Sequence, residues 1–267
     1  MSRVILPLKT NSLAFPGRAP GFDPSHFAAQ GMSNGNGFSG VTVAGGSNFI
    51  NLLSTKAGVF TGSGTGSIFG GAGPVLNITG SNNYLSFAGN VSNAPAGQTV
   101  GGIGFIQALT SKYPLFNVGG SAVGLVLGVN NNVLWCFGES GGDINSSLTL
   151  QVNTPYFFAV SVNATLSIEN FILVNLRTGQ VQTQQKTSAI GFGFAGGTYL
   201  LGNDTFSENW NGGIAAAMYA PNFLSIPQLI QWAQDPWSFW YPRTLDLVDM
   251  LSAGSGTPDV LMAQAWM

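Results

Sequence analysis

The sequence predicts an all-β protein, built as a two-sheet antiparallel sandwich of the jelly-roll type with one short helix and extended terminal arms. Short runs of strand-forming residues recur from residue 49 to residue 219, and clusters such as Asn130-Asn131-Asn132 and Thr178-Gly179 separate them. Gly and Asn tolerate the left-handed backbone that tight turns need. Hydrophobic residues make up 45% of the chain, too many for a disordered protein. Many short strands at this spacing indicate a sandwich or jelly roll.

Residues 1–48 predict an extended N-terminal arm rather than part of the sandwich. They contain four prolines and show no sustained period of 2 or 3.6 residues. Their short apolar stretches are expected to pack either on a neighbouring polypeptide or back on their own domain. The candidate attachment residues of the arm are Arg3, Lys9, Arg18 and His26.

Residues 49–243 are predicted to form the sandwich. Between residues 61 and 73 the chain is rich in Gly, Ser and Thr, and we expect a flexible surface loop there because too few strands precede it to form a separate core. The strands are expected at residues 49–53, 75–78, 84–87, 101–108, 115–118, 124–129, 133–137, 148–152, 156–162, 171–176, 180–185, 199–202 and 214–219.

One helix is predicted near residues 225–234. Ser225 and Gln228 have the spacing of a capping box, and an apolar face follows it before Pro236 ends the run. That face is Ile226, Leu229, Ile230 and Ala233. The C-terminal tail, residues 244–267, has no Lys or Arg and ends in apolar residues, so we expect it to dock on a partner.

Charge is the most unusual property of the sequence. Only 7% of the residues are charged, 8 basic and 10 acidic, whereas a soluble protein carries about 25%. Depletion of charge with enrichment of aromatic residues is typical of buried interface cores. We therefore expect a surface largely covered by other subunits, the alternative being an extracellular-type β domain with short Gly and Asn turns.

Several functions are excluded by what the sequence lacks. The net charge of −2 and the dispersed basic residues give no surface for nucleic acid. Cys136 is the single cysteine and His26 the single histidine, so no disulfide, zinc cluster or Ser-His-Asp triad is expected. Cys136 itself is best explained as a small buried hydrophobe. No secretory signal and no apolar window of about 18 residues is present, which predicts no membrane partner.

The acidic residues suggest a possible metal site but no catalytic one. Asp204, Glu208 and Asn209 are candidate calcium ligands, because Ca²⁺ takes carboxylate and amide oxygens, and a solvated hairpin loop is the alternative. No catalytic residues are predicted. Asp204 with Glu208, and Glu139 with Asp143, lie in turns, whereas glycoside hydrolysis needs carboxylates held at rigid positions.

Aromatic residues near the C-terminus are candidates for sugar stacking or for an interface. An aromatic face offers a broad contact area at little cost in conformational entropy. A hydrophobic plug between helix and sheet, or between subunits, is the alternative. The candidates are Trp210, Trp237, Trp240 and Tyr241.

The order of these segments carries a family resemblance. The segment Trp210-Asn211-Gly212-Gly213-Ile214, followed by Leu224-Ser225 and a capped helix, resembles the end of a concanavalin-A-like (laminin-G-like) jelly-roll domain. The likeness extends over about residues 75–235. Asp235-Pro236-Trp237 and the opening Arg3-Val4-Ile5-Leu6-Pro7 resemble versions encoded by tailed bacteriophages and prophages.

The resemblance implies a two-sheet sandwich and, in many relatives, carbohydrate or protein binding. Glycosidases of this fold carry the pattern E-x-D-x-x-E on one strand, and this sequence has no such run. We therefore expect a non-enzymatic virion structural protein that decorates, or forms an appendage on, the capsid or tail. A host-surface glycan-binding module of the particle is the second hypothesis, and a polysaccharide hydrolase the third.

The expected partners follow from the same resemblance. They are other virion proteins, copies of the chain itself and, under the second hypothesis, a host glycan. The expected location is the virion, assembled in the host cytoplasm. No cofactor is expected apart from the candidate calcium ion.

Overall fold

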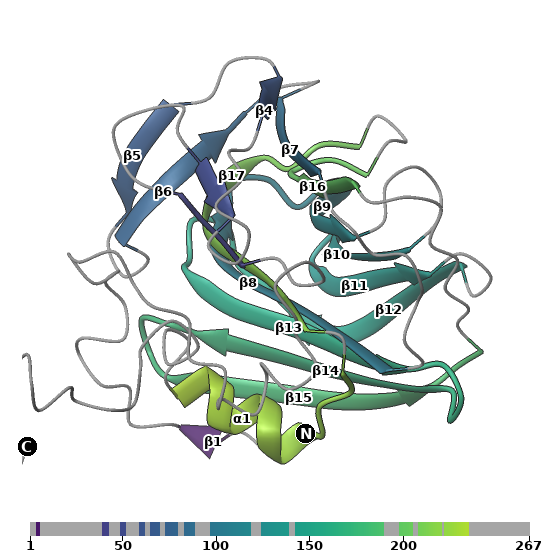
Figure 1. The fold of residues 1–267 in the computed structure, drawn as a ribbon. Coiled ribbons are helices and arrows are strands. Elements are labelled where there is room, and N and C mark those ends of the chain that lie inside the picture. The colour runs from purple at the N-terminus through teal and green to yellow at the C-terminus, as the bar shows by residue number, and fades with distance from the viewer. Residues whose placement is uncertain are drawn as a thin grey trace, which may run out of the picture.

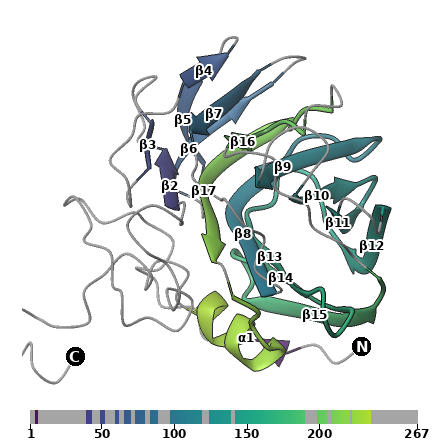
Figure 2. The ribbon, with the colours of Figure 1, turned by 45° about the vertical axis from the view of Figure 1, so that its right-hand side comes forward.

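A computed structural model shows two antiparallel β-sheets packed face to face, with one helix on the outside (Figures 1 and 2). This confirms the predicted two-sheet antiparallel sandwich with one short helix. The structure describes residues 4–5, 39–42, 49–51, 59–61, 65–69, 73–79, 83–88, 97–118, 124–138, 142–189, 198–204, 208–220 and 222–234.

The first sheet has ten strands among these residues, in the order β1-β15-β14-β13-β8-β17-β2-β3, with β6 paired to β17 and β5 paired to β6. The strands are β1 (Val4–Ile5), β2 (Ser39–Thr42), β3 (Phe49–Asn51), β5 (Thr65–Phe69), β6 (Gly73–Ile78), β8 (Gly97–Ile106), β13 (Tyr156–Asn163), β14 (Ile168–Asn175), β15 (Gln180–Thr187) and β17 (Gly212–Ala220).

The second sheet has seven strands in the described part of the chain, in the order β12-β11-β10-β9-β16-β7-β4. Its strands are β4 (Val59–Thr61), β7 (Tyr84–Ala88), β9 (Lys112–Val118), β10 (Leu125–Asn130), β11 (Val133–Gly138), β12 (Gly142–Thr149) and β16 (Thr198–Leu201).

Two apolar layers hold the molecule together. The layer between the sheets takes residues from both, among them Leu134 and Cys136 of β11 and Phe158 and Val160 of β13. Cys136 is buried there, as predicted. The second layer lies on the outer face of the ten-stranded sheet and contains the intervening residue Ala159 of β13. Because both faces of this sheet are buried, β13 is a nearly continuous apolar run rather than an alternating one.

The helix α1 (Ile226–Gln234) covers this outer layer. Trp232 packs edge-on against Phe157 of β13, with ring centroids 5.5 Å apart. One of the two hydrogen bonds of the predicted capping box is present, because the Ser225 backbone N–H donates to Gln228 Oε1 at 2.9 Å. The Ser225 hydroxyl donates to the same oxygen at 2.8 Å. The predicted apolar face is corrected by the structure: Leu229, Trp232 and Ala233 are buried, whereas Ile226 and Ile230 are only partly buried.

The structure corrects three predictions about the strands. Residues 61–73, expected as a loop, include β5, which pairs with β6 through Ile68 opposite Pro74. The strand expected at residues 148–152 instead spans 142–149, because only every second residue of β12 is buried and the apolar signal is weak. Pieces of residues 1–48 form β1, which pairs with β15, and β2, which pairs with β17.

These two pieces pack back on the sandwich, which was one of the two alternatives for the arm. The rest of residues 1–48 and all of residues 244–267 lie outside the described residues, so the boundaries of the arm and tail stay predictions. No helix in the described part of the chain is long and apolar enough to cross a membrane.

Side chains from β15 close one side of the sandwich over the edge strand β12. Gln184 Oε1 accepts from the Ser147 backbone N–H at 2.6 Å, and Lys186 Nζ donates to the Asn145 carbonyl at 2.6 Å. An exposed strand edge offers unpaired N–H and C=O groups to other chains. The long polar side chains of β15 occupy some of these groups and so protect this edge.

Candidate functional site

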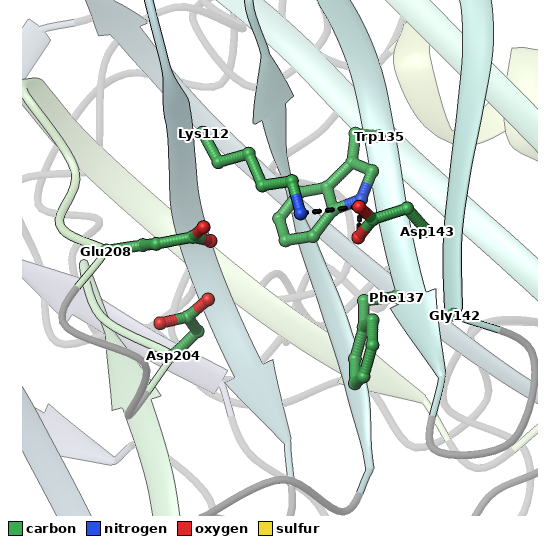
Figure 3. A pocket seen from close by; sticks show the side chains of 7 residues that line it. All are labelled: Lys112, Trp135, Phe137, Gly142, Asp143, Asp204 and Glu208. Atoms are coloured by element: carbon green, nitrogen blue, oxygen red, sulfur yellow. Dashed lines mark hydrogen bonds and ion pairs between the residues drawn. The ribbon is translucent and has the colours of Figure 1, made fainter.

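A cavity of about 350 Å³ lies against the seven-stranded sheet. Its walls come from three places: Lys112 at the start of β9, aromatic residues of β11 with the first residues of β12, and the segment between β16 and β17 (Figure 3). The lining residues are Lys112, Trp135, Phe137, Gly142, Asp143, Asp204 and Glu208.

Strand alternation places the two aromatic rings on the outer face. Leu134 and Cys136 point into the core between the sheets, so Trp135 and Phe137, one position on in each case, point the opposite way. Trp135 is 2% exposed and forms the floor of the pocket, whereas Phe137 is only partly buried.

Gly128 of β10 makes room for the tryptophan. It pairs with Trp135, and the register of β10 against β9 shifts at this point. A Cβ atom on Gly128 would lie 2.4 Å from the Tyr113 carbonyl oxygen and 3.1 Å from the Trp135 ring. A glycine is therefore required here for the two strands and the indole to approach so closely.

Asp143 is the polar centre of one wall. It lies opposite Phe137 in the β11–β12 pairing, on the same face. Its Oδ1 accepts a hydrogen bond from Trp135 Nε1 at 2.9 Å, and its Oδ2 forms an ion pair with Lys112 Nζ. The carboxylate thereby fixes both the indole and the ammonium.

Lys112 brings a positive charge over the aromatic floor. Its Nζ lies 5.5 Å from the centroid of the Trp135 ring, within range of a cation–π interaction. The hydrogen bond to Asp143 is the largest cause that raises the pKa of Lys112 above its ordinary value, so the side chain is an ammonium at any physiological pH.

Asp204 and Glu208 form the opposite wall. Figure 3 shows their carboxyl groups close together and directed toward the pocket. Burial raises the pKa of Glu208 to about 7, and a hydrogen bond to Asp204 and the charge of Asp204 act in the same direction. Near pH 7 the Glu208 carboxyl group is therefore protonated in part of the molecules.

The calcium prediction is only partly matched by this arrangement. Asp204 and Glu208 both line the pocket, but Asn209 Oδ1 accepts a hydrogen bond from Asn203 Nδ2 at 2.9 Å. In the part of the chain that the structure describes, no group of three or more His, Cys, Asp or Glu side chains is arranged to hold a metal ion.

The predicted aromatic site is corrected at Trp210. This residue is 0% exposed and its ring packs against Phe158 in the core between the sheets, with centroids 6.0 Å apart. Its ring is therefore not available to a sugar or a partner. The other predicted site residues, Trp237, Trp240 and Tyr241 with Arg3, Lys9, Arg18 and His26, lie outside the described residues.

Sequence reasoning missed Lys112, Trp135, Phe137 and Asp143 as site residues. Asp143 was expected in a turn, but the structure places it on β12. Trp135 and Phe137 flank Cys136 on β11. Their spacing of two, beside a hairpin turn at residues 130–132 that fixes the register of β10 and β11, was the available signal. The approach of Asp204 and Glu208 to this strand pair had no sequence signal, because it depends on the packing of β16 beside β9.

Neither a family model nor a curated protein sequence matches the chain. Several solved structures are similar to the chain in fold. The receptor-binding domain of the botulinum neurotoxin C/D mosaic serotype is similar with a TM-score of 0.55 and 13% identity, over 80% of this chain and 56% of that one. The binding domain of botulinum neurotoxin DC in complex with rat synaptotagmin II gives a TM-score of 0.55 and 13% identity, over 79% and 55%.

A third structure, the binding domain of botulinum neurotoxin DC in complex with SialylT, has a TM-score of 0.52 and 12% identity, over 74% of this chain and 51% of that one. This chain thus spans about half the length of these domains. At such identity the likeness shows the fold alone. The chain therefore has a two-sheet β-sandwich fold like that of these binding domains, with a polar and aromatic pocket on its seven-stranded sheet.

Proposed function

We propose that the chain is a glycan-binding adhesion domain and that the pocket over Trp135 is its binding site. One observation carries the proposal: a cavity of about 350 Å³ combines aromatic rings with charged groups that converge from separate parts of the fold. Small-molecule sites are typically concavities of this size, with apolar walls and a few oriented polar groups.

Each wall has a role in this proposal. The partly buried side chain of Phe137 lines the cavity, so a pyranose ring bound there would contact it. Trp135 is held beneath it by Asp143 and supports the shape of the pocket. The carboxylates and the Lys112 ammonium supply acceptors and a donor for sugar hydroxyls. Two of the similar binding domains were solved in complex with synaptotagmin II and with SialylT, which supports receptor or sugar binding in kind.

We propose binding without catalysis. Asp143 is engaged by both Lys112 and Trp135, and Asp204 and Glu208 lie next to each other rather than on either side of a cleft. Two carboxyl groups that flank a glycosidic bond are about 5 to 10 Å apart in glycosidases. Incubation with polysaccharide should release no reducing ends.

The proposal predicts that Phe137→Ala weakens glycan binding by about tenfold or more, because loss of an aromatic stacking face costs on the order of 1–3 kcal/mol. Titration calorimetry against oligosaccharides selected on a glycan array measures the change. Leu166→Ala is the matched control, because Leu166 is 59% exposed and does not line the pocket. Equal binding by the wild type and Phe137→Ala would refute the pocket as the site.

The low charge of the chain supports a second proposal, that this domain is a structural component of a bacteriophage particle. A chain in which only 7% of the residues are charged suits burial against other virion proteins and further copies of itself. In this setting the domain decorates the capsid or tail, or forms an appendage that brings the glycan site to the host surface. Imaging of intact particles with a label on this chain tests the location.

A further inference from the structure

We infer that the side chain of Lys186 is a pH-dependent clasp between the two sheets, which holds β12 while Glu169 is neutral and releases it when Glu169 is charged. Because β12 carries Asp143, the clasp also governs how firmly one wall of the pocket is held. The inference goes beyond the proposed function and does not depend on whether the pocket binds a glycan.

The clasp is one of three hydrogen bonds between β15 and the edge strand β12. They join alternate residues of the two strands, and the one from Lys186 is the only one of the three that involves a charged side chain. The three are Gln182 Nε2 to the Thr149 carbonyl at 3.4 Å, the Ser147 backbone N–H to Gln184 Oε1 at 2.6 Å, and Lys186 Nζ to the Asn145 carbonyl at 2.6 Å. Together they cover backbone groups that an exposed strand edge would offer to other chains.

Asn145 links the clasp to the pocket. It pairs in register with Trp135 of β11, and its Oδ1 accepts a hydrogen bond from Asn130 Nδ2 at 2.9 Å. Two residues earlier on the same strand, Asp143 holds the Trp135 indole and the Lys112 ammonium. A shift of β12 at Asn145 is therefore expected to reach the indole of Trp135.

Glu169 of β14 is placed to compete for Lys186. The two residues pair in register, so their side chains leave the same face of the sheet with Cβ atoms about 5 Å apart. Glu169 is 0% exposed, and neither of its carboxyl oxygens has a hydrogen-bond partner among the residues that the structure describes. A neutral carboxyl group is tolerated in such a place at a smaller cost than a carboxylate, which without a partner is strongly unfavourable.

Lys186 is the cation that can pair with a charged Glu169. Of the described groups that face Glu169, Lys186 of β15 and Cys136 of β11 are titratable. Burial raises the pKa of the Cys136 thiol, which therefore stays neutral when Glu169 ionises. The inward-facing side chains in the same row of β8 and β13, and those of β12, are neutral: Gln98, Val162, Ile144, Ser146 and Leu148.

Lys186 does not serve both partners in its present position. Neither Glu169 oxygen bonds to its Nζ, so the ammonium has to turn away from the Asn145 carbonyl to reach the carboxylate. The carboxylate is the stronger acceptor, because both partners of that bond are charged. Burial raises the pKa of Glu169 to about 7, so the clasp should be closed at about pH 6 and released at about pH 8.

The experiment observes β12 directly by NMR in the full chain, without a sugar. Hydrogen exchange at pH 6 and pH 8 gives a protection factor for the Ser147 amide, whose hydrogen bond is next to the clasp. A protection factor is a ratio to the exchange rate of the unfolded chain, so the direct effect of pH on exchange cancels. A nitrogen–proton spectrum follows the Trp135 indole N–H. The variants are Glu169→Gln, Lys186→Met and Glu208→Gln.

In the wild type we expect the protection factor of Ser147 to fall at least about fivefold from pH 6 to pH 8, because the local opening becomes more populated. The Trp135 indole signal should shift over the same pH range. Glu169→Gln should keep the high protection at both pH values, and Lys186→Met should have low protection at both. Glu208→Gln is the matched control, because Glu208 titrates near the same pH in the pocket, and its Ser147 protection should follow that of the wild type.

Equal protection of Ser147 at pH 6 and pH 8 in the wild type would overturn the inference. A fall that Glu169→Gln retains would overturn it as well, since another group would then be the cause. If the clasp responds as expected and no oligosaccharide binds, the inference stands and the proposed function fails. If the clasp does not respond and Phe137→Ala still weakens glycan binding, the inference fails and the proposed function stands. Circular dichroism of each variant verifies that it is folded.

Discussion

Glu169 is an ionisable residue placed in the core between the two sheets. It is 0% exposed, and it pairs in register with Val162 of β13 and Lys186 of β15. Neither carboxyl oxygen has a hydrogen-bond partner among the residues that the structure describes. Burial raises the pKa of Glu169 to about 7, although the charge of Lys186 acts in the opposite direction. The residue is therefore mainly neutral in the folded protein below pH 7.

This burial predicts a loss of stability between about pH 4.5 and pH 7. In the unfolded chain Glu169 ionises near its ordinary pKa of about 4.5, whereas in the folded chain it keeps its proton up to about 7. The unfolded state thus binds fewer protons in this window, and the free energy of unfolding falls as the pH rises. Below the window both states are protonated and the penalty is absent.

Glu169→Gln should remove this dependence and stabilise the protein at pH 8 by up to about 3 kcal/mol, since each pKa unit corresponds to about 1.4 kcal/mol. At pH 4 the variant and the wild type should be about equally stable. Urea unfolding at both pH values measures the difference. Because Glu208 titrates in the same range, Glu208→Gln is the control that separates the two carboxyl groups. If Glu169→Gln and the wild type differ in free energy of unfolding by the same amount at pH 4 and at pH 8, Glu169 is not the cause of the pH dependence.

At the scale of elements, the helix shows how packing decides which residues matter. Residues Ser225 and Asn170 fix its start: the cap is satisfied by Gln228, and Asn170 Nδ2 of β14 donates to the Leu224 carbonyl at 3.0 Å. The loop before α1 is thereby tied to the sheet on which the helix lies. Leu229 is 0% exposed under the helix, whereas Ile230 is only partly buried.

Leu229→Asp should therefore destabilise the fold by about 3 kcal/mol or more, because it removes a buried side chain and places a charge in an apolar layer. Ile230→Asp, which the sequence pattern ranks equally, should cost about 1 kcal/mol, since its carboxylate can reach water. Chemical denaturation of both variants beside the wild type measures the difference. Equal losses would mean that Ile230 is as fully covered as Leu229.

Strands buried on both faces were predicted well, and polar strands were not. The run from Tyr156 to Val162 is apolar throughout because each face of its sheet meets a core layer, so hydrophobicity alone locates it. In β12 the buried positions include Ser146, and the exposed positions Asp143 and Asn145 weaken the apolar signal. Its place is set by pairing with β11 and by the side chains of β15, which no local pattern shows.

The candidate site follows the same distinction. The alternation around Cys136 places Trp135 and Phe137 on one face, and this much was available in the sequence. The encounter of Lys112, Asp143 and Glu208 was not, because these residues come from three separate parts of the chain and meet only when the sheet has formed.

For the whole molecule, the proposed role in a particle and the scarcity of charge together predict that the attachment is nearly insensitive to salt. Among the described residues one ion pair is present, Lys112 with Asp143, and it belongs to the pocket. Contacts with other subunits must then depend on apolar burial and neutral hydrogen bonds. Salt at about 1 M screens exposed charges beyond about 3 Å but does not weaken burial.

Particles incubated in low and high NaCl should therefore retain similar amounts of this chain, measured by sedimentation and gel densitometry. A known ion-pair-dependent component of the same particles serves as the positive control. Substantial release at high salt alone would indicate that charged residues carry the attachment, with Arg3, Lys9 and Arg18 as the first to substitute.

The position of β17 in the ten-stranded sheet has a consequence for how the chain reaches its fold. This strand lies between β8 on one side and β2 and β6 on the other, so Ile106 pairs with Gly212 and Ile78 pairs with the same glycine. A growing chain that has not yet produced residue 212 leaves the edges of β8 and β6 without their partner. Contacts so distant in sequence slow folding, and unpaired strand edges invite aggregation. The closing strand therefore sets the time during which the nascent sheet is vulnerable, and fragments that end before it should aggregate.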